Sequence, residues 1–187
     1  MLVAAVLAQL GASTRLDAQE ARVPADLQVA LFAKILSFDR NLATRCGPVI
    51  DITVLYQANN TESREAALGF VAAFEKTPVL ISGRTVSVTA VAIERIIDAQ
   101  ATMQSRDPDV VYIAPMRAIG IGDVIHAIID YGAAAITPVR HYVENGAAVG
   151  VELQGGRPHV LVNLRAARGQ GMDLSAQLLK LAELVGQ

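Results

Sequence analysis

Apolar side chains recur along this chain at two different spacings, which predict where helices and strands lie. From residue 24 onward they return every three or four positions, as they do on one face of a helix. The predicted face consists of Leu27, Leu31, Ile35, Phe38 and Leu42. Pro24 suits the first turn of this helix, because the N–H that proline lacks would have no helical partner there.

Strands and helices then alternate. A β-branched run over 49–56, bounded by turn residues, predicts a buried strand. Shorter runs predict strands at 86–89, 110–113 and 133–136. Helical spacing separates them, after residue 60, after residue 93 and from about residue 123. This alternation favours a mostly parallel sheet with helices on both faces.

The last third of the chain has a different pattern. Alternating residues at 149–153 and an apolar run at 160–162 flank Gly155 and Gly156, which predicts an antiparallel hairpin with a glycine turn. A final helix is expected after Asp173, which can cap it. Its apolar face would consist of Leu174, Leu178, Leu181, Ala182 and Val185. The predicted fold class is therefore α/β: a mostly parallel sheet flanked by helices on both faces, ending in an antiparallel hairpin and a C-terminal helix.

The first residues are patterned like an export signal. An apolar run over 2–11 has about the length of a signal-peptide hydrophobic region, and a polar stretch follows it. We expect residues 1–21 to be a signal peptide and polar leader, and residues 22–187 to form one domain. The alternative is an N-terminal helix or strand of the core, because no positive residue precedes the apolar run.

Composition narrows the classes of function. Of the 187 residues 52% are hydrophobic, yet no apolar stretch reaches the roughly 18 residues that a membrane span needs. A net charge of −2 and an aromatic content of 4% argue against a nucleic-acid partner. Proteins that bind nucleic acids usually have a basic surface and aromatic side chains on which bases stack. We therefore expect no nucleic acid to bind.

No residue pattern predicts a catalytic site, a cofactor or a metal. Gly120 and Gly122 begin a dinucleotide-binding pattern, but Ile125 stands where the third glycine would be, so a plain turn is favoured. The histidines, at 126, 141 and 159, lack the spacing of a metal site. Cys46 is the single cysteine, which excludes an internal disulfide and favours an inert thiol.

Two polar features stand out nonetheless. The segment 138–143 mixes cationic, aromatic and apolar residues in a predicted loop at the carboxyl end of a strand. Arg140, His141 and Tyr142 are therefore a possible partner surface, with ordinary loop packing as the alternative. Asn163 ends an apolar strand, where its amide can satisfy backbone groups and tie the hairpin to the last helix.

The C-terminal third resembles the closing motif of the YfiR/HmsC family of small periplasmic regulators. That motif is a glycine hairpin, a strand ending in Asn, a short Ala-rich helix, a Gly-Leu-x-Leu-Ser stretch and a Leu-Leu-x-Leu-Ala helix. The matching positions, which we expect to be structural, are Gly146, Gly155, Gly156, Asn163, Gly171, Leu178 and Leu179. A looser resemblance extends over about 27–185.

The resemblance implies a non-enzymatic, exported and often dimeric protein. Its implied partner is the sensor region of a membrane-bound diguanylate cyclase or histidine kinase, which it would hold inactive. Cyclic di-GMP would be the downstream signal and not a ligand. Two alternatives remain: a periplasmic small-ligand-binding protein resembling one lobe of a solute receptor, since such a sheet offers a crevice, and an enzyme with an unfamiliar site.

Overall fold

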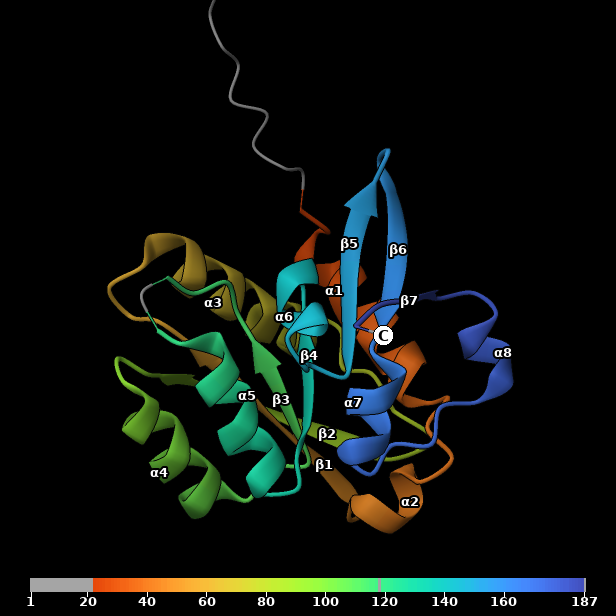
Figure 1. Cartoon of the computed structure of the whole chain (residues 1–187), viewed down its shortest axis with the longest axis horizontal. Helices are drawn as coiled ribbons and strands as arrows, with labels where there is room; N and C mark the ends of the chain where they lie inside the picture. Colours follow the sequence, from red (N-terminus) through yellow and green to blue (C-terminus); the bar gives the residue numbers. More distant parts are fainter. Residues whose placement is uncertain (1–21, 118, 187) are drawn as a thin grey trace, which may run out of the picture.

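A computed structural model describes residues 22–117 and 119–186. The predicted leader therefore lies outside the described residues. One sheet of seven strands runs through this part of the chain in the order β2-β1-β3-β4-β5-β6-β7 (Figure 1). Only β5 and β6 pair antiparallel. The strands are β1 (Val49–Tyr56), β2 (Thr85–Ala92), β3 (Val110–Ile113), β4 (Ala134–Thr137), β5 (Val149–Gln154), β6 (Arg157–Val162) and β7 (Glu183–Leu184).

Helices cover both faces of this sheet. The longer ones form two hydrophobic layers: α1 and α3 pack on one face, α4 and α5 on the other. The helices are α1 (Ala25–Leu36), α2 (Leu42–Arg45), α3 (Thr61–Lys76), α4 (Ile96–Arg106), α5 (Ile121–Asp130), α6 (Arg140–Glu144), α7 (Leu164–Gly169) and α8 (Ala176–Leu179). The predicted fold class, including the hairpin, is thereby confirmed.

An aromatic cluster fills the core between α1, α3 and β3. The rings of Phe70 and Tyr112 stack with centroids 4.0 Å apart, and Phe32 meets both rings edge-on. Such pairs stabilise beyond the area they bury. The Tyr112 hydroxyl donates to Gln28 Oε1 at 2.9 Å, and Gln28 Nε2 donates to the carbonyl of Val23 at 2.7 Å. Burial raises the pKa of Tyr112, so this phenol stays a donor.

The predicted face of the first helix is correct only in part: Ile35 is buried and Leu31 packs against the core. Leu27 is 37% exposed, and the helix ends at Leu36 instead of continuing to Phe38 and Leu42. Besides Ile35, the buried face includes Val29, Phe32 and Leu36. Spacing of three and four along apolar residues allows either face, and packing against the aromatic cluster decides between them.

The final helix is shorter than predicted. The chain turns after Leu179 and then adds β7, which pairs in parallel with β6. Ser175 caps α8 by accepting from Leu178 N, whereas Asp173 forms an ion pair with Arg40 at 2.6 Å. Leu178 is buried as expected, but Leu181 is 74% exposed. None of the described helices is both long and apolar enough to cross a membrane.

Candidate functional site

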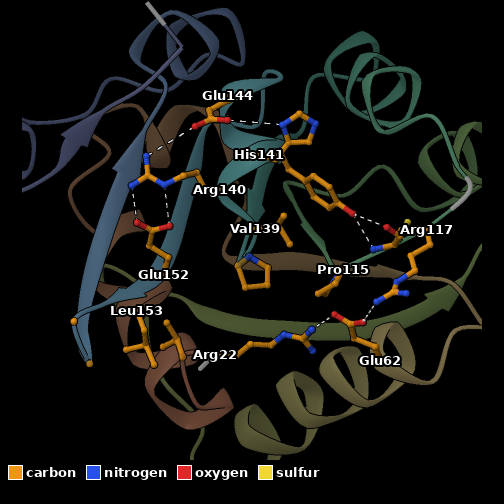
Figure 2. Close-up of a pocket in the computed structure, with 16 residues that line it drawn as sticks. Arg22, Glu62, Pro115, Arg117, Val139, Arg140, His141, Glu144, Glu152 and Leu153 are labelled. Atoms are coloured by element: carbon orange, nitrogen blue, oxygen red, sulfur yellow. Dashed lines mark hydrogen bonds and ion pairs between the residues drawn. The ribbon is translucent and has the colours of Figure 1, made fainter. Parts of the chain in front are cut away.

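A cleft of about 1020 Å³ opens at the carboxyl ends of β3, β4 and β5. Loops that follow strands in parallel sheets commonly build binding sites at this edge. Its walls come from segments far apart in the chain (Figure 2). They include Arg22 and Glu62, the loop after β3 with Arg117, the start of α6 with Arg140, and the hairpin with Glu152.

Buried polar contacts hold the floor of the cleft. The Tyr142 hydroxyl accepts from the N–H of Met116 at 2.8 Å and donates to the carbonyl of the same residue at 3.0 Å. Burial raises the pKa of Tyr142, which keeps its proton in place for the second bond. Thr137 adds a bond from its hydroxyl to the carbonyl of Ile113 at 3.0 Å. The loop after β3 is thus fixed to α6, and the end of β3 is fixed to the end of β4.

Arg140 organises one wall of the cleft. Its guanidinium donates to both carboxylate oxygens of Glu152 on β5, at 2.5 and 2.9 Å. It also donates to both oxygens of Glu183 on β7, at 2.9 Å each. These paired carboxylates raise the pKa of Arg140, and the guanidinium lowers the pKa of Glu183. One cation therefore joins α6, the hairpin and the C-terminal strand.

Glu62 on α3 organises the facing wall. Its carboxylate contacts Arg22 through one oxygen and Arg117 through the other, the latter at 3.1 Å (Figure 2). The backbone N–H of Arg117 also donates to Gln57 Oε1 at 3.0 Å. Opposite charges therefore lie on both walls, with the apolar side chains of Pro115, Val139 and Leu153 between them.

The three residues of the predicted partner surface line this cleft but differ in their surroundings. They lie on the short helix α6, so the predicted loop is wrong. Arg140 is occupied by its two carboxylates, and Tyr142 is 7% exposed with its hydroxyl committed to Met116. His141 is open to solvent, with 72% of its side chain exposed, and its Nδ1 lies 3.7 Å from Glu144.

The residues of the predicted family motif lie around the hairpin and the C-terminal segment. Asn163 accepts from Ala166 N at 2.9 Å and so caps α7, and it donates to the carbonyl of Val143 at 2.9 Å. Gly155 and Gly156 turn the hairpin with φ of 57° and 76°. The remaining motif positions are Gly146, whose carbonyl accepts from Gln170, Gly171 at positive φ, buried Leu178 and half-buried Leu179.

The other candidate groups do not gather at the cleft. Gly120 precedes the first turn of α5, and His126 is exposed on that helix. Burial raises the pKa of the Cys46 thiol to about 11, with Asp109 adding to the shift. No cluster of three or more potential metal ligands occurs among the described residues.

Sequence reasoning missed Glu62, Glu152 and Glu183, which neutralise the arginines of the cleft. Their partners are 12 to 55 positions away, so no local spacing marks them. Chemically, the cleft offers guanidinium and carboxylate groups on its two walls, with apolar side chains between them. Such a surface suits recognition of a polar partner or a small charged molecule.

The sequence matches one known protein family over most of its length. The family described as YfiR/HmsC-like matches residues 52–183. No curated protein matches at a significant level.

Solved structures resemble this fold at low sequence identity. An ABC domain from Streptococcus pneumonia in complex with L-Trp has 18% identity and a TM-score of 0.62, with 87% of this chain and 62% of that one covered. A conserved domain protein from Vibrio cholerae O1 biovar El Tor has 16% identity and a TM-score of 0.60, covering 87% and 60%. A ligand-free, open substrate-binding protein with adhesive properties from Clostridium difficile has 13% identity and a TM-score of 0.54, covering 73% and 54%. This chain thus spans less than two thirds of each, and the likeness concerns the fold alone.

Proposed function

This chain belongs to the YfiR/HmsC-like family, and from that premise we propose that it is a periplasmic, non-enzymatic regulator. Its partner is the sensor region of a membrane-bound diguanylate cyclase or histidine kinase, which it holds inactive. The observation that carries the proposal is the family match over residues 52–183. It includes β3, β4, the hairpin and Glu183, and therefore most of the cleft.

The shape of the carboxyl edge supports a role in protein recognition. The β5–β6 hairpin projects beyond the rest of the sheet (Figure 1) and forms one wall of the cleft. Arg140 holds this hairpin through Glu152, so the projection is ordered before any partner arrives. Preorganisation of this kind reduces the entropy that binding costs.

Regulation would follow from unequal affinity for two states of the sensor. A protein that binds the inactive conformation more tightly shifts the population toward it, by no more than that difference in affinity. No chemical step is needed. Exposed His141 at the mouth of the cleft is the residue best placed for direct contact.

Export is part of the proposal and has its own test. Mass spectrometry of the periplasmic fraction should find a mature protein that begins between about residues 12 and 22. An intact cytoplasmic protein that begins at Met1 would contradict it.

Sensor control is tested by deleting the gene in cells that contain the membrane-bound cyclase or kinase encoded beside it. Loss of the regulator should raise cyclic di-GMP or kinase output. Complementation with His141→Glu should restore repression poorly, because the exposed ring lies at the proposed contact. His126→Glu, an equivalent change on the exposed face of α5, should restore it fully. Unchanged output after deletion would reject the regulatory role.

A small-ligand receptor is the second candidate. The cleft of about 1020 Å³ favours it, and two neighbours in fold are described as a complex with L-Trp and as a substrate-binding protein. Calorimetric titration with a panel of amino acids and other small charged metabolites should then reveal binding that Arg117→Ala weakens. Absence of binding across such a panel would argue against the receptor and favour the regulator.

A further inference from the structure

A smaller hollow lies between α7 and β7, near the end of the described chain (Figure 1). Its volume is about 370 Å³, and small-molecule sites typically have roughly 300 to 1,000 Å³. The residues that line it are Leu164, Arg165, Arg168, Leu184, Val185 and Gly186. None of them lines the cleft at the carboxyl edge, so the two sites are separate.

The inner surface of this hollow is apolar. Leu184, on β7, is 40% exposed although its side chain is large and apolar. Val185 is buried and packs with Val143 and Leu161 in a small hydrophobic cluster. Half-buried Leu164 packs against the main core. Because moving an apolar group from water onto such a surface is favourable, the hollow suits the apolar part of a ligand.

Gly186 fixes the C-terminal wall of the hollow. Its φ is 67°, a left-handed value that favours glycine. A side chain at this position would collide with the amide of Asn163, which caps α7 and donates to the carbonyl of Val143. The N–H of Val185 donates to the carbonyl of Val162 at 3.0 Å. The wall is therefore formed before a ligand arrives, which lowers the entropy that binding costs.

Two exposed arginines border the apolar surface. Arg165 and Arg168 are three positions apart on α7 and therefore lie on the same side of the helix, where both guanidiniums can reach one anion. Within residues 22–117 and 119–186, every ion pair joins other residues. Glu183 is next to Leu184 in the chain, but its carboxylate is bound by Arg140. The two arginines thus keep their charge available to a ligand.

From this combination we propose that the hollow binds a single-chain anionic amphiphile of the fatty-acid class. The apolar tail lies against Leu164, Leu184 and Val185. The carboxylate accepts hydrogen bonds from Arg165 and Arg168. Such a molecule complements the site in both polarity and charge, since a neutral ligand would leave the guanidiniums without an anion and a wholly polar one would leave the leucines in water.

Calorimetric titration of the purified full chain with decanoate tests this site. The wild type should bind with a dissociation constant of about 50 μM or tighter. The double variant Arg165→Ala/Arg168→Ala should bind about tenfold more weakly. Arg157→Ala removes an exposed arginine at the hairpin turn and should leave the affinity unchanged. No sensor is present in this assay, so the site and the proposed regulatory role can fail separately.

A neutral ligand with the same tail separates the contribution of the charge. Decanol should bind the wild type about tenfold more weakly than decanoate does, and it should bind the double variant as well as it binds the wild type. Circular-dichroism melts of the ligand-free variants should match that of the wild type, because both arginine side chains are exposed. The comparison of decanoate with decanol on the wild type needs no variant to fold.

NMR spectroscopy locates the bound tail. Methyl signals of Leu164, Leu184 and Val185 should shift when decanoate is added, whereas those of Val139 and Leu153 in the cleft should not. Absence of both binding heat and methyl shifts would overturn the proposal, as would shifts confined to the cleft or equal affinity of the double variant. Binding to phosphatidylglycerol vesicles without binding to decanoate would also overturn it, in favour of a membrane-docking surface.

Discussion

Arg140 and Glu183 lie 43 positions apart in the chain, yet the guanidinium donates to both oxygens of this carboxylate at 2.9 Å. Arg140 also donates to Glu152 on the hairpin. The ion pair of Arg140 with Glu183 therefore connects the C-terminal strand to the wall of the cleft. The short β7 is thus secured by a side-chain contact as well as by its ladder with β6.

Replacing Arg140 by Ala should loosen both β7 and the hairpin. Two carboxylates lose charge-assisted hydrogen bonds, and we expect a loss of about 1 to 3 kcal/mol in the free energy of unfolding. Urea denaturation measures it. Arg157→Ala, at the exposed hairpin turn, is the control and should change stability by less than about 0.5 kcal/mol. Equal effects of the two changes would show that the contacts of Arg140 contribute nothing.

The same pair predicts a pH dependence. The guanidinium lowers the pKa of Glu183 in the folded protein. The stabilisation by this pair is therefore fully present above the ordinary pKa of a glutamate, and it is lost as pH falls through the lowered value. NMR titration of the Glu183 carboxyl should find the lowered pKa in the wild type and an ordinary one in Arg140→Ala. An unchanged pKa in the variant would rule out Arg140 as its cause.

Leu178→Asp should unfold the domain. Leu178 is 3% exposed and packs into the core beneath α8. Burying an unpaired carboxylate there should cost several kcal/mol, against a total stability of roughly 5 to 15 kcal/mol. Leu181→Asp, at a position 74% exposed in the next turn of chain, should leave the circular-dichroism melt unchanged. A circular-dichroism melt of Leu178→Asp like that of the wild type would show that Leu178 is not a core residue.

Asn163→Ala should cost about 2 kcal/mol, since it removes the cap of α7 and leaves the buried carbonyl of Val143 without its donor. Asn145→Ala is a suitable comparison because exposed Asn145 bonds within its own helix end, to the carbonyl of His141. Chemical denaturation of the two variants should separate them clearly. If both variants lose the same small free energy of unfolding, the hydrogen bonds of Asn163 to α6 and α7 contribute nothing to stability.

The sequence predicts best the elements that local pattern determines. The β-branched run at 49–56 and the paired glycines at 155 and 156 led to β1 and the hairpin as they stand. The face of α1 was predicted only in part, because both Leu27 and Phe32 fit helical spacing, and only the aromatic partners of Phe32 place that ring in the core. β7 was missed because Glu183 and Leu184 become a strand through pairing with β6.

The candidate site was only partly predictable, for a similar reason. The position of Arg140 to Tyr142 at the carboxyl edge follows from the order of strands and helices. The contacts of Arg140 with Glu152 and Glu183 depend on the hairpin and β7 folding back over α6. Long-range ion pairs of this kind leave no periodicity in the sequence.

The proposed regulatory role depends most on direct contact between this protein and a membrane-bound sensor. The decisive measurement is a calorimetric titration of the purified mature chain into the purified extracytoplasmic region of the cyclase or kinase encoded beside it. We predict a complex with a dissociation constant of about 10 μM or tighter, which His141→Glu weakens about tenfold and His126→Glu leaves unchanged. No heat of binding at protein concentrations of about 100 μM, together with no complex by size-exclusion chromatography, would contradict the regulatory account.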